Sequence, residues 1–399
     1  MAITDKEQGV WILDEVYNKI NQGSIWEYSG ANDLFSMGRG NNGLLGLNAE
    51  SSTSDGRSSP TQVPGNWLGE FCKGNTTDSN TIMFVGKETA GTLWTWGLAS
   101  SGSNAMNNNV GYSSPVQVGT SSSWAQAWSG GGQMMGTKTD GTLWTCGNAG
   151  YGALGHNNVT NRSSPMQLPG SWSTTSGAIA QGSPNNLYAI KSDGSLWSWG
   201  RNNRGQLGHD NTDHRSSPTA VGTDTTWSKL AIGGGQNMAA IKTNGTLWSW
   251  GYNAAGMLGH NNQTQYESPK QVGTDTTWRT ILINNNVAHA TKTDGTFWSW
   301  GRNLEGQLGK TWPTNTYRSS PVQVGTDTNW SEAHNLSAPA GCVAVKTDGT
   351  LWSWGYGNYG MTGQNDRSNY SSPKQVGTAT DWREMVGGAN STIFSMKSK

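Results

Sequence analysis

The sequence has little charge and no excess of either sign. Charged residues make up 13% of the 399 residues, and 26 basic side chains balance 26 acidic ones. A neutral chain offers no basic footprint for nucleic acid or for an anionic membrane. No run of 18 apolar residues occurs, and the opening MAITDKEQGV lacks the apolar core of a signal peptide. We therefore expect no nucleic-acid binding, no membrane insertion and synthesis in the cytoplasm.

Residues that commonly form catalytic or metal sites are also scarce. The three cysteines cannot build a disulfide framework, and Cys146 stands where most repeats have a second tryptophan, as a small buried filler. The six histidines show neither HxH nor HExxH spacing. No nucleophile–base pair or phosphate-binding loop is present, because the glycine-rich stretch at 129–135 recurs inside the repeats. The sequence predicts no catalytic residue, no cofactor, no metal site and a non-enzymatic protein.

Glycine and tryptophan are abundant, with 56 and 22 residues, and they mark an internal repeat. A motif close to GTLWSWG recurs at intervals of about 50 residues, a period that indicates a solenoid or a propeller. Three markers each recur seven times: the last glycine of this motif, a Ser-Pro dipeptide and a later tryptophan. Their positions are Gly38, Gly97, Gly147, Gly200, Gly251, Gly301, Gly355; Pro60, Pro115, Pro165, Pro218, Pro269, Pro321, Pro373; and Trp67, Trp124, Trp172, Trp227, Trp278, Trp330, Trp382.

The local pattern of each repeat is that of a β-hairpin. In AAIKTNGTLWSWG, residues 239–251, two β-rich runs flank Asn-Gly, and related copies have Asp-Gly. These dipeptides fit two-residue hairpin turns, in which both central residues need a positive φ. Seven such units predict an all-β fold, a seven-bladed β-propeller. We expect residues 31–399 to form this propeller and residues 1–30 to form a separate helical leader.

The first repeat lacks its first strand, and the end of the chain supplies it. DLFSMG, residues 33–38, begins where a hairpin turn has just been passed, whereas NSTIFSMKSK, residues 390–399, ends where one should begin. The C-terminal strand is therefore expected to complete the first blade, which leaves no open sheet edge. The residues predicted to close the ring are Leu34, Phe35, Ile393 and Phe394.

Stretches such as DGSLWSWGRNNRGQLGHDN, residues 193–211, resemble the regulator of chromosome condensation repeat family. This resemblance extends from Leu34 to the end of the chain and implies a seven-bladed propeller. The family's nucleotide exchange on a small GTPase is not expected, because GGGQNM stands at 233–238 where Gly-x-x-His is frequent. A plant UV-B photoreceptor of this fold uses Gly-Trp-Arg-His-Thr motifs, which are missing here. We expect the tryptophans to be structural.

The stretches between Leu-Gly and Ser-Pro differ most between repeats and are rich in Asn, Thr, Tyr and Arg. Amides and aromatic rings suit the recognition of a glycan or a protein surface, although such stretches also occur as plain solvated loops. The longest one spans 310–318. The candidate recognition residues are Trp312, Tyr317, Tyr266 and Tyr370.

The leader is predicted to be a short amphipathic helix. Thr4 and Glu7 form a capping box, and Gly23 can end the helix. Its apolar stripe packs either on the propeller or on a partner, and Trp11, Leu13 and Tyr17 are the expected anchors.

The leader is similar to N-terminal segments of bacteriophage virion proteins. This resemblance implies a virion structural protein that displays a rigid propeller on the tail or head surface, for assembly or host-surface binding. Its partners would be other virion proteins and a host-surface glycan or protein. The alternative is an intracellular propeller scaffold that binds a protein partner.

Overall fold

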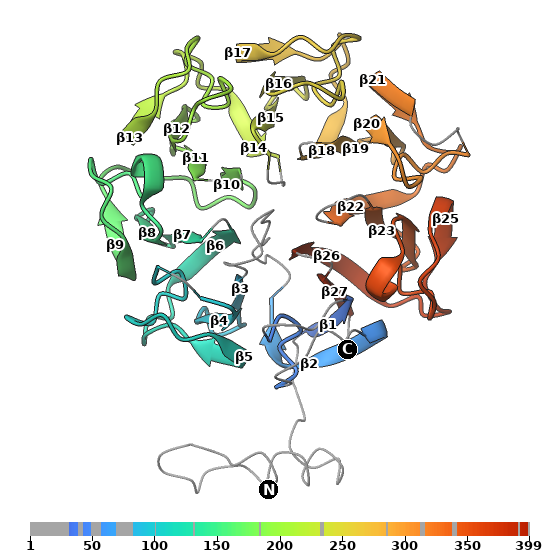
Figure 1. Ribbon diagram of the computed structural model, residues 1–399, viewed down its shortest axis with the longest axis horizontal. Coiled ribbons are helices and arrows are strands. Elements are labelled where there is room, and N and C mark those ends of the chain that lie inside the picture. The colour runs from blue at the N-terminus through green and yellow to red at the C-terminus, as the bar shows by residue number, and fades with distance from the viewer. Residues whose placement is uncertain are drawn as a thin grey trace, which may run out of the picture.

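The computed structural model describes most of the chain between residues 32 and 397. The described ranges are 32–38, 43–48, 57–68, 83–99, 101–130, 132–182, 185–231, 235–284, 286–311, 316–336, 341–389 and 392–397. Regular structure in these ranges is β-strand, apart from two 3-10 turns, η1 (Gly150–Gly152) and η2 (Asn358–Gly360). Figure 1 shows the sheets arranged radially around a common centre, as in a β-propeller. A search of the same ranges finds no helix with the length and apolar character needed to span a membrane.

Each complete blade is an antiparallel sheet whose fourth strand lies at the outer rim (Figure 1). One blade joins the two ends of the described chain, in the order β2 (Arg57–Trp67), β1 (Asn32–Gly38), β27 (Thr392–Lys397), β26 (Trp382–Ala389). Two blades of the first half of the chain are β6 (Trp124–Gly130), β7 (Gln133–Lys138), β8 (Leu143–Gly147), β9 (Arg162–Leu168); and β10 (Ile179–Gly182), β11 (Asn186–Ile190), β12 (Leu196–Gly200), β13 (Arg215–Ala220).

Three further blades follow along the chain. They are β14 (Trp227–Leu230), β15 (Asn237–Lys242), β16 (Leu247–Gly251), β17 (Tyr266–Gln271); β18 (Trp278–Ile283), β19 (Val287–Lys292), β20 (Phe297–Asn303), β21 (Thr316–Gln323); and β22 (Trp330–Leu336), β23 (Gly341–Lys346), β24 (Leu351–Gly355), β25 (Tyr370–Gln375). A shorter sheet of three strands consists of β3 (Met83–Lys87), β4 (Leu93–Gly97) and β5 (Tyr112–Gln117).

The predicted fold therefore needs two corrections. Six blades are complete, and the sheet β3–β4–β5 has three strands within the described ranges, so the prediction of seven complete blades is wrong. The residues before β3 read EFCKGNTTDSNTI at 70–82 and lie outside the described ranges. They include Gly, Asn, Asp and Lys, which are depleted in strands. The described residues contain no α-helix either, and the predicted leader helix with Trp11, Leu13 and Tyr17 lies outside them.

Both ends of the described chain meet in one blade. β27 pairs with β1, with Leu34 opposite Met396 and Met37 opposite Ile393. On its other edge β27 pairs with β26. Leu34 is fully buried and Phe35 partly buried, whereas Ile393 and Phe394 are described here by their backbone pairing alone. The hydrogen bonds between β1 and β27 thus close the ring.

The hairpin turns differ from the expected two-residue type. At the turn after β15, Gly245 N donates to Lys242 O (2.9 Å) and Lys242 N donates to Thr246 O (3.0 Å). Only Gly245 has a positive φ, of 76°. This is a type I turn followed by a glycine bulge, which explains why Asn and Asp are interchangeable before the glycine. The Asp or Asn side chain accepts hydrogen bonds from the residue that follows the glycine, as Asp294 Oδ1 does from Thr296 N (2.9 Å).

Tryptophans fill the spaces between blades. Trp250 of β16 is fully buried, packs at 6.1 Å (centroid to centroid) from Trp227, and donates Nε1–H to the backbone oxygen of Gln206 in the preceding blade (2.7 Å). The same bond recurs in the next junction, where Trp300 Nε1 donates to Met257 O (2.7 Å). Each such tryptophan links two blades through packing and one hydrogen bond, which supports the structural role expected from the sequence.

Candidate functional site

A lysine at the end of the second strand of each complete blade lies between two aromatic rings. Lys242 Nζ stands 4.7 Å from the ring centroid of Trp227 and 3.7 Å from that of Trp248. Cation–π attraction of this kind grows when the site is partly desolvated. The equivalent lysines between two rings are Lys138, Lys191, Lys292, Lys346 and Lys397.

Four of these lysines also pair with an aspartate. Lys242 Nζ lies 2.6 Å from Asp224, and the other pairs are Lys292–Asp275, Lys346–Asp327 and Lys397–Asp381. Burial alone would raise the pKa of Asp224, but hydrogen bonds from Lys242 and Thr226 outweigh it and lower the pKa to about 2. Lys138 and Lys191 have no carboxylate at ion-pair distance in the described ranges, since Ser121 replaces the aspartate at one turn and the other turn is shorter.

A pocket opens beside this lysine between neighbouring blades. Between the blades β10–β13 and β14–β17 it has a volume of about 530 Å³, and its walls include His209, Asp224, Lys242 and Trp248. This volume lies within the usual range of ligand sites, roughly 300–1,000 Å³. The pocket is bordered by the start of the loop that joins the third and fourth strands, so the pocket and the loop form one continuous surface.

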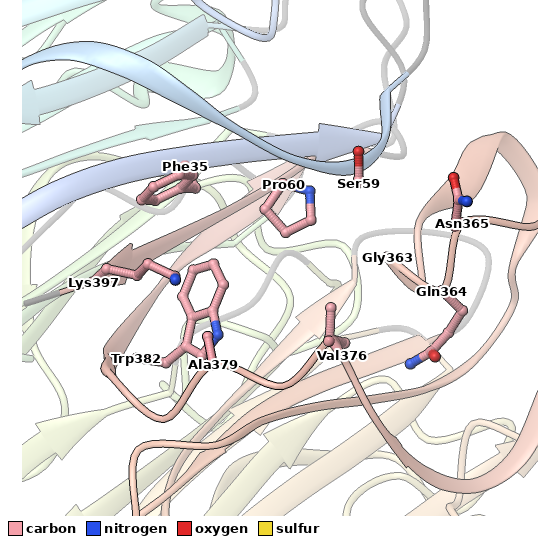
Figure 2. Close-up of a pocket in the computed structure, with 11 residues that line it drawn as sticks. Phe35, Ser59, Pro60, Gly363, Gln364, Asn365, Val376, Ala379, Trp382 and Lys397 are labelled. Atoms are coloured by element: carbon pink, nitrogen blue, oxygen red, sulfur yellow. The ribbon is translucent and has the colours of Figure 1, made fainter.

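The equivalent pocket at the closing blade has a volume of about 570 Å³ and is shown in Figure 2. Phe35 stands there in place of Trp248, and Ala379 in place of Asp224. Figure 2 shows the Lys397 side chain extending towards Trp382 on one side of the space, with Val376 on another. The two pockets thus occupy equivalent blade junctions, but the side chains that line them differ.

Polar groups at the mouths of these pockets are already engaged. His209 Nε2 lies 3.0 Å from Ser198 Oγ, and burial together with the charge of Arg215 lowers the pKa of His209. His156 and His260 make the same contact in their own blades. Burial also lowers the pKa of His260, to about 4, against a smaller opposite effect of Ser249. These histidines hold the loops as neutral hydrogen-bonding groups.

The predicted recognition tyrosines do not lie together. Lys270 Nζ donates to the Tyr266 hydroxyl (3.0 Å) and stands 4.2 Å from the ring centroid. Tyr370 has the same arrangement with Lys374, at 2.9 Å and 4.2 Å. Both hydroxyls are therefore held within their own blades. Tyr317, opposite Arg302 at the start of β21, is 44% exposed, and Trp312 lies outside the described residues.

Sequence reasoning missed an exposed apolar group on the blade β6–β9. Tyr151, Val159 and Met166 are 45%, 68% and 41% exposed, and they account for three of the five large apolar side chains that the described ranges expose. The available signal was Val159 inside the otherwise polar HNNVTNR and Met166 directly after Ser-Pro. Single apolar residues of this kind are common in variable loops. Their sequence positions alone therefore do not indicate an exposed apolar group.

The described ranges hold no cluster of three or more His, Cys, Asp or Glu side chains that could bind a metal. Cys146 and Cys342 are buried, and burial raises the pKa of the Cys146 thiol to about 12 and that of Cys342 well above its usual value. Neither thiol is available as a nucleophile in the folded chain. Cys72 lies outside the described residues.

Several of the sequence repeats that form the blades match a known repeat family. The family model described as the regulator of chromosome condensation (RCC1) repeat matches residues 140–182, 193–240, 244–287 and 348–395, and a second model of this repeat matches residues 178–206. These stretches contain four of the Asp-Gly or Asn-Gly turns, which begin at Asp140, Asp193, Asn244 and Asp348. Of the lysines between aromatic rings they contain Lys191 alone, in the second match. The chain therefore carries RCC1-type repeats on an RCC1-like propeller.

Curated relatives match over part of their length. The zebrafish (Danio rerio) protein RCC2 homolog is 41% identical over 76 residues, which cover 19% of this chain and 15% of that protein. The ultraviolet-B receptor UVR8 of Arabidopsis thaliana is 29% identical over 221 residues, which cover 52% of this chain and 47% of that receptor. The chain thus spans less than half of the length of either protein.

Solved structures agree over nearly the whole chain. The structure of Prp20p from Saccharomyces cerevisiae, a protein characterised for its binding to Gsp1p and histones, superposes with a TM-score of 0.79 at 17% identity and covers 93% of this chain and 92% of that one. Human WBSCR16 gives a TM-score of 0.75 at 16% identity and covers 92% and 99%. At such low identity these matches establish the fold and leave the function to the chain's own residues.

Proposed function

We propose that the chain is a non-catalytic propeller that binds a protein partner through the loop and outer strand of the blade β6–β9. The observation that carries this proposal is the exposure of Tyr151, Val159 and Met166 on one blade. Exposed apolar groups that gather in one place mark interaction sites more often than scattered ones. Tyrosine and methionine are also enriched in interfaces.

The loop between β8 and β9, which carries Tyr151 and Val159, is held rigidly by hydrogen bonds to both neighbouring sheets. Asn157 N donates to Ser216 O of the next blade (2.7 Å), and Ser163 Oγ bonds to Asn107 of the previous sheet (3.1 Å), so the loop is fixed on both sides. A fixed loop loses less conformational entropy when a partner binds. The similar propeller of Prp20p supports this proposal, because Gsp1p and histones are protein partners of that chain.

The test is a comparison of partner capture by matched variants of the full chain. The wild-type chain, a Val159→Asp/Met166→Asp double variant and a Tyr317→Asp variant are used as bait in extract of the source cells. We expect one or more proteins to be retained by the wild type and by Tyr317→Asp, but not by the double variant. If the double variant still retains the partner proteins and Tyr317→Asp does not, the binding site lies instead at the predicted recognition loop that precedes β21. Equal capture by all three would refute both locations.

The narrower hypothesis of a virion protein rests on the similarity of the leader, residues 1–30, to phage segments. Mass spectrometry of purified particles tests it directly, because a virion component must be present in stoichiometric amounts. Its absence from the particles would leave the scaffold as the sole hypothesis of the two.

A further inference from the structure

Tyr151 has an unusual backbone conformation and an exposed ring. Its φ of 58° and ψ of 18° lie in the left-handed region, which is unfavourable for a residue with a large side chain. The ring packs edge-on against His214 of the next blade, with 4.7 Å between centroids, and the Arg201 guanidinium carbon lies 5.2 Å from its centroid. An unfavourable conformation that presents an aromatic ring at a blade junction points to a function.

Arg201 beside this ring and Arg215 on the adjoining strand have no carboxylate partner among the described residues. Arg201 directly follows β12, and Arg215 begins β13 opposite Gly200. In both side chains Nε is buried and has no hydrogen-bond acceptor among the described residues, and the same holds for Arg162 at the start of β9. The lysines of the pockets differ, since four of them are neutralised by aspartates. The positive charge of these arginines is therefore not balanced by an ion pair in the described structure.

The junction between the two blades brings these residues together. Asn157 N donates to Ser216 O (2.7 Å), and Gly152, with φ of 76°, approaches Ser216 so closely that a Cβ there would meet its Cα at 2.3 Å. The loop that carries Tyr151 is thus seated on the first residues of β13. We call Tyr151, Arg201, His214 and Arg215 the Tyr151 cluster.

The acidic residues of the loop between β12 and β13 do not pair with these arginines. Asp210 and Asp213 are exposed, and neither forms an ion pair with an arginine in the described ranges. The backbone N–H of Asn202 donates to His214 Nδ1 (2.9 Å), which fixes the orientation of the His214 ring. The charge available to a ligand is therefore the guanidinium groups, which match a carboxylate with two parallel hydrogen bonds.

We propose that the Tyr151 cluster binds an acidic segment of a protein, with Asp or Glu carboxylates on Arg201 and Arg215 and apolar side chains over Tyr151. This inference deepens the proposed function and rests on it. A protein segment fits better than a nucleic acid, because the blade whose loop carries Tyr151 also exposes the apolar Val159 and Met166, and because the whole chain has no net charge. Arginine and tyrosine are also the residues that most often dominate binding energy at interfaces.

The test measures fluorescence anisotropy of a labelled acidic decapeptide, GSEDFEEDGS, against its amide counterpart GSQNFQQNGS, with the full chain. We expect the acidic peptide to bind at least about tenfold more tightly, and Arg201→Gln and Arg215→Gln each to weaken it about tenfold. Tyr151→Asn keeps a residue that tolerates the left-handed conformation and should weaken binding by about fivefold. Arg302→Gln is the matched control, since it has the same repeat position and an equally unpaired Nε but no Tyr151, and should change affinity less than about twofold.

Three outcomes would overturn the inference. Equal binding of the amide peptide would show that carboxylates are not recognised. Tighter binding of a single-stranded oligonucleotide, lost in Arg201→Gln and Arg215→Gln, would assign the cluster to phosphates. If neither peptide binds while the Val159→Asp/Met166→Asp variant still loses its captured partner, the acidic segment is refuted and the proposed function stands.

Discussion

Replacing His289 by methionine should remove a large part of the acid sensitivity of the fold. His289 lies in β19 and is fully buried, with its ring centroid 5.7 Å from Phe297 and 6.3 Å from Trp354. Neither ring nitrogen has a hydrogen-bond partner among the described residues. Burial lowers the pKa of His289 from its usual 6.5 to about 3, because the charged ring would lose its hydration without gaining a partner.

The sign of the effect follows from this lowered pKa. Above about pH 6.5 the ring is neutral in both the folded and the unfolded chain, so it causes no pH dependence there. Between about pH 6.5 and 3 the unfolded chain takes up a proton that the folded chain excludes, and the free energy of unfolding falls. At pH 5 this loss amounts to about 2 kcal/mol. Met135 stands at the equivalent position of β7, so a methionine side chain suits this part of the blade.

The assay is urea denaturation followed by circular dichroism at pH 7.5 and pH 5. His289→Met should lower the difference in unfolding free energy between the two pH values by about 2 kcal/mol, and it should be as stable as the wild type at pH 7.5. Val110→Gln, which alters an exposed side chain that does not titrate, is the control and should leave the difference unchanged. An unchanged pH dependence in His289→Met would refute the assignment of a neutral, unpaired histidine to this site.

Three further predictions concern the ring and the leader. Removal of residues 391–399 takes away β27 and should lower the melting temperature strongly, because β26 loses its partner in the sheet and β1 keeps β2 alone; an unchanged value would refute closure by this strand. Trp250→Ala should cost about 3–5 kcal/mol through the cavity it leaves, and Trp248→Ala clearly less, because Trp248 is only partly buried; urea denaturation would show the order, and equal costs would contradict it. A chain that begins at Gln22 should keep its melting temperature, and on gel filtration it should not enter any assembly that the full chain forms. Aggregation of this shortened chain would instead place the leader in the propeller core.

Much of the blade structure can be predicted from the sequence, because the signals are local. The alternation in LWSWG and the Asp-Gly or Asn-Gly dipeptide place two strands and their turn in each repeat. The partnership of β1 and β27 also follows, since Leu34 and Lys397 occupy the positions that Leu247 and Lys242 hold in a complete repeat. The three-stranded sheet could not be predicted, because the repeat count from Gly, Pro and Trp markers says nothing about the composition of residues 70–82.

The candidate site was harder to predict than the fold. The Tyr266–Lys270 and Tyr370–Lys374 contacts were readable, because residues four apart on a strand lie on the same face. The exposure of Tyr151 depends on a positive φ, and its contact with Arg201 depends on the packing of two blades. Neither property is encoded in a local pattern, so the interaction surface proposed here required the arrangement of the blades.

The closing strand has a consequence for how the chain acquires its structure during synthesis. β1 is made first and β27 is the last strand of the described chain, yet they are hydrogen-bonded neighbours. Until residues 392–397 have left the ribosome, β1 and β26 have unpaired edges that can pair with another nascent chain. Because contacts of such long sequence separation form late, the final step should be slow. The chain is therefore most prone to aggregate while it is still attached to the ribosome. A chaperone that covers the free edges of β1 and β26 during this time would raise the yield of closed rings.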